Sequence, residues 1–463
     1  MITAEVLVQL RVAGVHQQGL APQLHDLLLG GEDDDILLAD EARTYELVDR
    51  MFATLHNSLR SRTVNIGMDE AGLLGLGRYL TLHGYQDRYS ILMNHLRKVS
   101  EIAKKYGFEL LMWGDMFFRL APGGEYYADY VEIPPEIKEL VPDNVQLVYW
   151  DYYSTTISGY EKKIQQHNAI KENIWFAGGL WSWSGYAPHN TFSINAMRCA
   201  MNACLSQGVE YVIMTLWGDD GAECSKFAMI PSLFYVSQLA KGITDDGEIR
   251  RNFEEKFSIP FDAFMLLDLT GTPNESDSEI IAADKYMLYC DPFMGQFDSR
   301  IRPQDGPSYE VCARKLEMWQ NQKDYGYLFC TQKALCDVLA VKYDLGIRTR
   351  EAYHFGNLET VKTLVTDYEA LLSQLEHFYT AYEAQWMYEN KPHGFDVIDL
   401  RLGGLRQRIV HCMKRLQAYV DGNLTRIEEL EEPVLDCCCI EDAGAKPLNC
   451  ARFWNEIATV NVI

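Results

Sequence analysis

Asp69 and Glu70 are adjacent carboxylates whose types and spacing could do acid–base chemistry. They end a short apolar run that starts at Val64, and Gly72 and Gly75 follow closely. Side chains alternate between the two faces of a strand, so Glu70 can share a site with Asp69 only if the strand stops there. The glycines that follow favour such a stop.

The carboxyl end of a predicted strand is where parallel sheets and barrels usually hold catalytic groups. Two neighbouring carboxylates in a desolvated pocket push their pKa values apart, so one can donate a proton while the other stays charged. From this run alone, a solvated acidic pair at the start of a loop is the alternative interpretation. The residues that follow along the chain favour a site.

Tryptophans recur where the later predicted strands end. One tryptophan at a strand end usually belongs to the core, but repetition at successive strand ends is not explained by packing alone. An aromatic wall beside a carboxylate pair suits a carbohydrate, because a pyranose offers apolar C–H faces to aromatic rings and hydroxyls to acids. The residues concerned are Trp113 and Asp115, Trp150 and Tyr152, Trp181 and Trp183, and Trp217 and Asp219.

Strand and helix patterns alternate along residues 39–217. The strands are apolar on both faces, and units of this length match a (β/α)8 barrel. The predicted strands are Val64–Glu70, Phe108–Asp115, Val145–Trp150, Asn173–Gly178 and Tyr211–Trp217, and the predicted helices are Ala39–Ser61, Arg88–Lys105, Pro134–Leu140, Gly159–Glu172 and Ser193–Gln207.

The rest of the chain completes the predicted domain organisation. We expect an α/β fold, a (β/α)8-type TIM barrel over residues 36–243 that is incomplete at its N-terminal side. A divergent segment, residues 1–35, precedes it, with one strand at Val6–Val12. Residues 244–463 carry long amphipathic patterns and are predicted to form an all-helical domain. Its clearest helices are Leu328–Gly346, Leu358–Tyr388 and Val397–Tyr419.

The run Asn65-Ile66-Gly67-Met68-Asp69-Glu70, followed in order by Trp113, Trp150-Asp151-Tyr152 and Trp217-Gly218-Asp219, resembles the catalytic domain of glycoside hydrolase family 20, the β-N-acetylhexosaminidases. The resemblance is greatest to the branch whose barrel is followed by a helical domain. It implies removal of terminal β-linked N-acetylglucosamine or N-acetylgalactosamine with retention, the substrate's own 2-acetamido oxygen acting as nucleophile and forming an oxazolinium intermediate.

The resemblance also implies roles for individual residues. Glu70 would be the general acid and then the general base, and Asp69 would hold the acetamide N–H and stabilise the oxazolinium charge. Tyr152 would bind the acetamide carbonyl, and Asp219 would bind ring hydroxyls. The predicted aromatic wall consists of Trp113, Trp150 and Trp217, with either Trp181 or Trp183 at a neighbouring subsite.

The chain departs from the family pattern before the acid pair. The family places this pair after its fourth strand, whereas at most one candidate strand precedes Asp69 here. The arginine of the family's first strand has no counterpart, and His16 is a candidate for a diverged remnant of its histidine. An alternative function is therefore a non-catalytic or inactive sugar-binding barrel fragment. A metal-dependent barrel enzyme that uses Asp69, Glu70 and Asp115 is a further alternative.

Charge and cysteine usage restrict partners and location. Lys and Arg number 42 against 66 Asp and Glu, a net charge of −24 that opposes binding to nucleic acid or to an anionic membrane. No apolar run is long enough to span a bilayer and no leader pattern opens the chain, so we expect a cytoplasmic protein.

The twelve cysteines form no CxxC pairs and predict reduced thiols. Cys437–Cys439 next to Asp436 make a poor metal site because adjacent thiolates do not readily point at one ion. We expect no metal and no cofactor. The expected partner is a glycan or amino-sugar substrate, and the unpaired strand edges of an incomplete barrel favour a homo-oligomer.

Overall fold

The computed structural model describes residues 8–9, 36–121, 124–272, 283–301, 305–435 and 457–459. The chain divides into two compact units. Unit 1 comprises Met1–Gly178 and Ala196–Thr215, and unit 2 comprises Gly179–Asn195 and Leu216–Ile463. The predicted domain limits at residues 36 and 243 stay predictions. Most of the predicted segment 1–35, with His16, lies outside the described residues, as do Asp436 and Cys437–Cys439.

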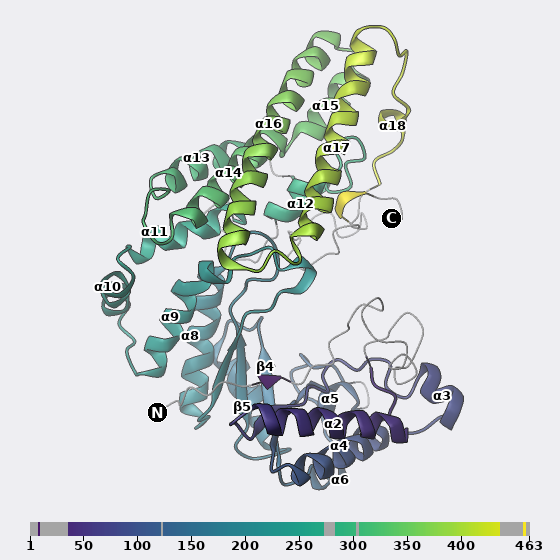
Figure 1. Cartoon of the computed structure of the whole chain (residues 1–463), viewed down its shortest axis with the longest axis vertical. Coiled ribbons are helices and arrows are strands. Elements are labelled where there is room, and N and C mark those ends of the chain that lie inside the picture. The colour runs from purple at the N-terminus through teal and green to yellow at the C-terminus, as the bar shows by residue number, and fades with distance from the viewer. Residues whose placement is uncertain are drawn as a thin grey trace. The chain divides into compact units, whose positions relative to one another are not determined.

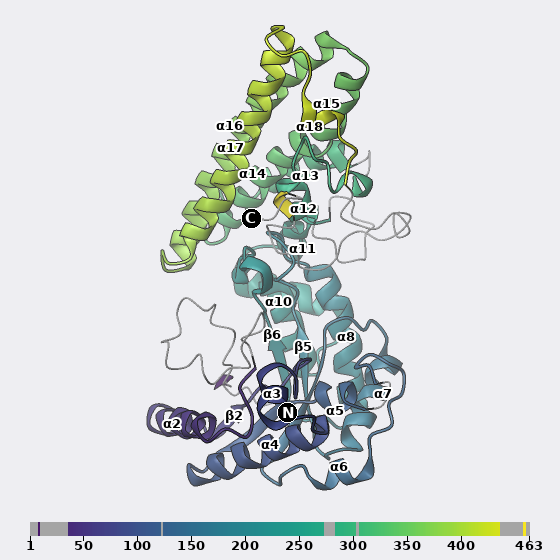
Figure 2. The same ribbon diagram turned by 90° about the vertical axis from the view of Figure 1, so that its right-hand side faces the viewer.

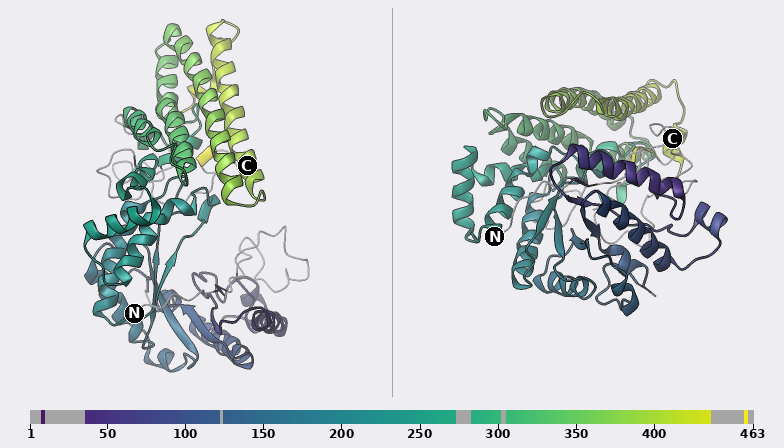
Figure 3. Two further views of the ribbon diagram at one scale, coloured as in Figure 1. Left: turned by 60° about the vertical axis from the view of Figure 1, so that its left-hand side comes forward. Right: turned by 60° about the horizontal axis from the view of Figure 1, so that its bottom comes forward.

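Unit 1 is built on a sheet with six strands in the described part of the chain, in the order β1 to β6. Figure 3 shows helices beside this sheet. β1 pairs with β2, β2 with β3, β3 with β4 and β4 with β5, all in parallel. Val64, Leu110 and Val145, which lie in register, are fully buried because helices cover such sheets. The strands are Val8–Gln9 (β1), Thr63–Asn65 (β2), Glu109–Trp113 (β3), Val145–Asp151 (β4), Trp175–Gly179 (β5) and Val212–Thr215 (β6).

Helices connect these strands, which confirms the predicted incomplete (β/α) barrel (Figure 1). Helix α4 has the predicted bounds because both of its ends are set locally. Asp87 accepts a hydrogen bond from the Ser90 N–H over 2.8 Å, and Gly107 lies just past the last turn at a φ of 73°. The helices are Ala42–Ser58 (α2), Gly77–His83 (α3), Arg88–Lys105 (α4), Asp115–Arg119 (α5), Pro135–Glu139 (α6), Ile157–Asn168 (α7) and Asn190–Ser206 (α8).

In unit 2, every element described after residue 216 is helical, and from residue 244 onward this confirms the predicted helical content. The predicted helix Leu328–Gly346 is wrong at its end. It stops at Lys342, and a second helix starts at Leu345, because the backbone leaves the helical region at Asp344 (φ −115°, ψ 4°). The larger helices are Ile230–Ala240 (α9), Asp246–Phe257 (α10), Asp305–Glu317 (α13), Gly326–Lys342 (α14), Leu345–His354 (α15), Leu358–Glu389 (α16) and Phe395–Val420 (α17).

The shorter helices complete unit 2. They are Phe261–Met265 (α11), Ala283–Tyr289 (α12) and Glu428–Glu431 (α18), with 3-10 turns at Asp219–Gly221 (η1), Lys226–Met229 (η2), Leu266–Thr270 (η3) and Asp298–Arg300 (η4).

The long helices α16 and α17 lie side by side (Figures 1 and 2). Phe378 and Tyr382 are fully buried, with ring centroids 5.8 Å apart, and belong to the core. None of the described helices combines the length and hydropathy needed to cross a bilayer.

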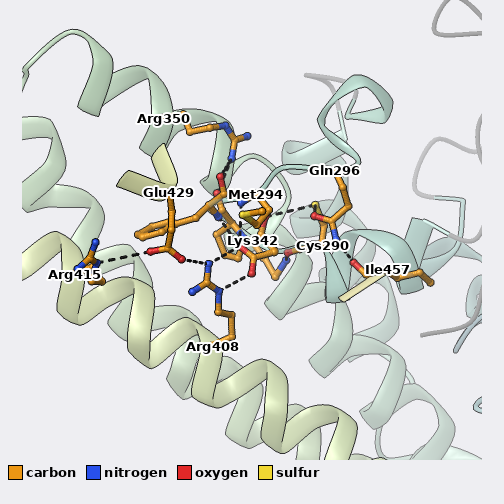
Figure 4. A network of polar contacts seen from close by, with 12 residues as sticks. Cys290, Met294, Gln296, Lys342, Arg350, Arg408, Arg415, Glu429 and Ile457 are labelled. Carbon is orange, nitrogen blue, oxygen red and sulfur yellow. Dashed lines mark hydrogen bonds and ion pairs between the residues drawn. The ribbon is translucent and has the colours of Figure 1, made fainter. Parts of the chain in front are cut away.

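A buried polar network joins α17 to the segment after α12 (Figure 4). Arg408 donates to Asp291 over 2.6 Å and to Glu429 over 2.8 Å. The ammonium group of Lys342, on α14, donates to the carbonyls of Met287 and Cys290 over 2.8 and 2.6 Å. Each of these charged groups has a hydrogen-bond partner, so none of them is buried without compensation.

Candidate active site

The acid pair lies in a sharp turn after β2. The prediction of a strand that continues to Glu70 is wrong, because β2 ends at Asn65. The Asn65 side chain accepts a hydrogen bond from the Gly67 N–H over 2.8 Å. Gly67, Met68 and Glu70 then adopt φ values of 73°, 68° and 51°. L-residues rarely adopt this left-handed region, so Met68 and Glu70 require support from the surrounding structure.

That support comes from the end of β3. The Glu70 N–H donates to Oδ2 of Asp115 over 3.0 Å. Asp115 is the first residue of α5, and Arg119 lies one helical turn further on. Nε of Arg119 donates to the same Asp115 oxygen over 2.8 Å, and its Nη2 lies 3.3 Å from Oε1 of Glu70. The structure therefore brings Glu70, Asp115 and Arg119 together.

The two carboxylates of this group have different environments. The side chain of Asp115 is completely buried, and that of Glu70 is 60% exposed. Burial raises the pKa of Asp115 to about 6. Burial is the largest cause of this raised pKa, the negative charge of Asp69 acts in the same direction, and the Glu70 N–H, Arg119 and Trp150 oppose it. Desolvation was predicted for the acid pair, Asp69 and Glu70. The completely buried carboxylate of this group is instead Asp115.

The aromatic residues of unit 1 gather at the ends of β3 and β4. Trp113, Trp150 and Tyr152 are all buried, and the Trp150 and Tyr152 rings stack with centroids 5.2 Å apart. Tyr126 packs on Trp150 at 4.7 Å. Its hydroxyl donates to the Trp150 carbonyl over 2.7 Å and accepts from the Trp150 N–H over 3.2 Å. Tyr126 therefore supports Trp150, a residue of the predicted wall.

Asp151, between Trp150 and Tyr152, closes a turn. Its Oδ1 accepts from the backbone N–H groups of Tyr153 and Ser154, and its Oδ2 accepts from the hydroxyls of Ser154 and Tyr149. Asp151 is buried, and these donors use both of its oxygens. It therefore shapes the end of β4.

The other predicted aromatic residues belong to unit 2. Trp181 and Trp183 are both buried and stack on one another at 4.3 Å with an interplanar angle of 27°. The Trp217 carbonyl accepts from the Ser182 hydroxyl over 3.0 Å and from the Lys226 ammonium group. Asp219 is exposed at the start of η1. Unit 2 therefore joins the segment 181–183 to the segment 217–219.

Helices of unit 2 contact residues that follow each of these two segments. Glu223, which is 1% exposed, pairs with Lys285 of α12 over 3.0 Å and with Arg401 of α17 over 2.9 Å. The Tyr382 hydroxyl donates to the Glu223 carbonyl over 2.9 Å. Asp284 accepts from the Ala187 N–H over 2.7 Å. No sequence pattern predicted these contacts, because the residues that make them are far apart in the chain.

Sequence reasoning also missed Arg119 and Tyr126. The available signal was the spacing of Asp115 and Arg119, which places them on one face of a short helix. The predicted site residues are divided between the units, with Asp69, Glu70, Trp113, Trp150 and Tyr152 in unit 1 and Trp181, Trp217 and Asp219 in unit 2. Their roles stay predictions.

Two other features of the described residues bear on where a ligand could bind. Within the described ranges, no three His, Cys, Asp or Glu residues are grouped so as to hold a metal ion. A cavity of about 470 Å³ in unit 2 is lined by Tyr289, Asp291, Arg401 and Arg408, among others, and contains none of the predicted site residues.

Comparison with known proteins gives a match to a family model and to solved structures. Residues 262–446 match the Glycoside Hydrolase 20C C-terminal domain. No curated protein sequence matches the chain.

Among solved structures, a GH138 enzyme targeting pectin rhamnogalacturonan II shares 8% identity at a TM-score of 0.36, with 83% of this chain and 65% of that chain covered. A GH20 exo-β-N-acetylglucosaminidase from Vibrio harveyi, in complex with N-acetylglucosamine, shares 14% identity at a TM-score of 0.34. The match covers 53% of this chain and 40% of that one. Both TM-scores are too low to say what this chain does.

The family match lies in the helical part of the chain and agrees with the resemblance carried by the acid pair and the tryptophans. Residues 262–446, which make up most of the helical part of the chain, are thus similar to the C-terminal domain of glycoside hydrolase 20C proteins.

Proposed function

We propose that the chain is a glycosidase that removes terminal β-linked N-acetylhexosamine with retention of configuration. The observation that carries the proposal is the end of β2, where Glu70 presents an exposed carboxylate from a backbone tied to the buried Asp115. A proton donor for a glycosidic oxygen needs this combination of access and fixed position.

In the proposed first step, protonated Glu70 donates its proton to the leaving oxygen. The acetamido oxygen of the substrate attacks the anomeric carbon as the glycosidic bond breaks, and an oxazolinium ion forms. Asp69 accepts a hydrogen bond from the acetamide N–H and stabilises the positive charge. In the second step, the Glu70 carboxylate takes a proton from a water molecule. The oxygen of this water attacks the anomeric carbon and opens the oxazolinium ring, which restores the acetamide.

We assign substrate contacts to the aromatic residues. Trp113 and Trp150 would pack against the acetamide and the sugar ring, and Tyr152 would donate to the acetamide carbonyl. In unit 2, Trp217 would stack on the sugar and Asp219 would accept from its hydroxyls. Trp181, which packs face to face with Trp183, would serve a neighbouring subsite.

The direct test uses the full chain and aryl β-N-acetylglucosaminides and β-N-acetylgalactosaminides. Glu70→Gln should lower kcat by roughly 10²- to 10⁴-fold, the usual contribution of a general acid. The matched control is Glu101→Gln, an exposed glutamate that pairs with Arg97 on α4. No hydrolysis by the wild type, or equal activity of wild type and Glu70→Gln, would refute the proposal.

The alternative is a non-catalytic sugar-binding protein, favoured by a sheet with six strands in the described ranges against the eight of a complete barrel. Calorimetry with a thiazoline mimic of the oxazolinium separates the two. Binding of the mimic without hydrolysis of any aryl glycoside supports the alternative.

We also propose a cytoplasmic location and a homo-oligomer. The eight cysteines in the described part of the chain are all free, in agreement with a reducing compartment. Light scattering of the purified chain tests the oligomeric state.

A further inference from the structure

We propose that Asp115 and Arg119 are positioning residues for Glu70, with Asp115 holding its backbone and Arg119 holding its carboxylate. The inference rests on the proposed function, because it takes Glu70 as the acid and base. Nothing in the resemblance assigns a role to either residue.

Asp115 holds the backbone of Glu70. Glu70 has a φ of 51°, a conformation that is unfavourable for any residue with a Cβ. Its N–H has one described acceptor, Oδ2 of Asp115, at 3.0 Å. Because Asp115 is completely buried at the start of α5, its carboxylate has a fixed position. The hydrogen bond therefore fixes the direction in which the Glu70 side chain leaves the backbone.

Arg119 holds the carboxylate of Glu70. The Arg119 guanidinium contacts Oδ2 of Asp115 through Nε and Oε1 of Glu70 through Nη2, at 2.8 and 3.3 Å. The carbon at the centre of this guanidinium lies 5.8 Å from the centroid of the Tyr126 ring. A planar guanidinium with two fixed contacts restricts the rotation of the carboxylate that it binds. The contact uses Oε1, so Oε2 is the oxygen assigned to proton transfer.

The charge of Asp115 determines how strongly it attracts the Glu70 N–H and Arg119. The charged and titratable groups that face Asp115 are Arg119 from α5, Asp69 from the turn, and Tyr126, with the Trp150 indole also adjacent. Burial raises the pKa of Asp115 to about 6, so near neutral pH this carboxylate is ionised and pairs with Arg119. As the pH falls through 6, Asp115 gains a proton and its attraction for both donors weakens.

The activity test compares two leaving groups. Loss of general-acid function slows hydrolysis of a methyl glycoside far more than that of a 4-nitrophenyl glycoside, because nitrophenolate leaves without a proton. Arg119→Ala and Asp115→Ala should lower kcat for methyl β-N-acetylglucosaminide by about 10²-fold and that for the nitrophenyl substrate much less, with little change in KM. Asp115→Asn should recover part of this loss, since its amide oxygen can occupy the place of Oδ2.

Matched controls separate positioning from folding. Arg97→Ala removes an arginine from another i,i+4 pair, with Glu101 at 2.6 Å, away from the site. Asp268→Asn alters a second buried carboxyl with a pKa raised to about 6, which accepts the Asn190 N–H over 3.1 Å. Both controls should leave the ratio of the two activities unchanged. Equal losses on both substrates in Arg119→Ala, alongside a selective loss in Glu70→Gln, would overturn this inference and leave the proposed function intact.

A second measurement does not depend on activity. In a 15N-glutamate-labelled chain, the amide resonance of Glu70, assigned from Glu70→Gln, should shift with a midpoint near pH 6, and Asp115→Asn should abolish the shift. If the wild type hydrolyses neither substrate, the proposed function fails on its own. An amide resonance that does not titrate near pH 6 overturns the inference in either case.

Discussion

The backbone N–H of Glu70 and the carboxylate of Asp115 are 45 positions apart in the chain and are joined by a 3.0 Å hydrogen bond. This contact links the ends of β2 and β3, two neighbouring parallel strands. It combines a buried anchor with an exposed acid, so that a strained turn can hold a solvent-accessible carboxylate at a constant place.

The buried Asp115 should make stability depend on pH. Its pKa is about 6 in the folded chain against an ordinary value of 3.8, so the folded state holds this proton more tightly. The stabilisation that this tighter proton binding provides is complete below about pH 4 and is lost as the pH rises through about 6. Relative to Asp115→Asn, the wild-type free energy of unfolding should fall by roughly 2 to 3 kcal/mol between pH 4 and pH 7.

Denaturant unfolding of the two proteins at several pH values measures this difference. Other buried carboxyls, Asp268 and Asp284, also have pKa values raised to about 6, so only the difference between the proteins reports Asp115. Parallel curves for the two proteins would contradict the prediction.

Tyr126→Phe should raise KM. The mutation keeps the ring on Trp150 but removes the hydroxyl that bonds both the carbonyl and the N–H of Trp150. The lost hydrogen bonds should cost about 1 to 3 kcal/mol of stability and let the Trp150 ring move. Tyr160→Phe is the control, since this buried tyrosine donates to the Ser154 carbonyl over 2.7 Å. A KM change of the same size in the control would show that Tyr126 has no special role.

Gly114→Ala should destabilise unit 1. A Cβ at this position would lie 2.6 Å from Cδ2 of His167, a fully buried ring that packs on Phe118 at 4.5 Å. Such overpacking costs about 1 to 3 kcal/mol, and it should also displace Asp115, the next residue. Gly403→Ala on α17 meets no atom within 4 Å and should gain about 0.5 to 1 kcal/mol. Thermal unfolding of the two variants measures both effects. A Gly114→Ala variant as stable as the wild type would argue against the close packing of Gly114 on His167.

Glu223→Gln should loosen the segment that carries Trp217 and Asp219. The change leaves Lys285 and Arg401 without the buried anion at 3.0 and 2.9 Å, a loss of about 3 to 5 kcal/mol. Hydrogen exchange over residues 216–229 should rise before the helices exchange. The matched control is Asp367→Asn, in a part-exposed pair with Arg348, which should cost at most about 1 kcal/mol. Unchanged exchange in Glu223→Gln would show that the segment is held by other contacts.

The sequence alone determined the features that depend on local chemistry. Helix α4 has its predicted bounds because its cap and stop residues are adjacent to it. The parallel strands were predictable because burial on both faces requires apolar runs. The acid pair and its tryptophans were recognisable because their types and order are readable without coordinates.

Only the tertiary structure decided how these residues are held. The strand before Asp69 ends early, and the left-handed turn that follows it is supported by Asp115, the first residue of α5. Trp181 and Trp183 are both buried and stack on one another with ring centroids 4.3 Å apart, which their spacing in the sequence did not predict. Arg119 pairs with Asp115 because the two residues are four positions apart on one helix. Its contact with Glu70 depends on the fold, which brings the end of β2 close to α5. Contacts between distant segments depend on the packing of the whole unit, and periodicity in one segment cannot encode them.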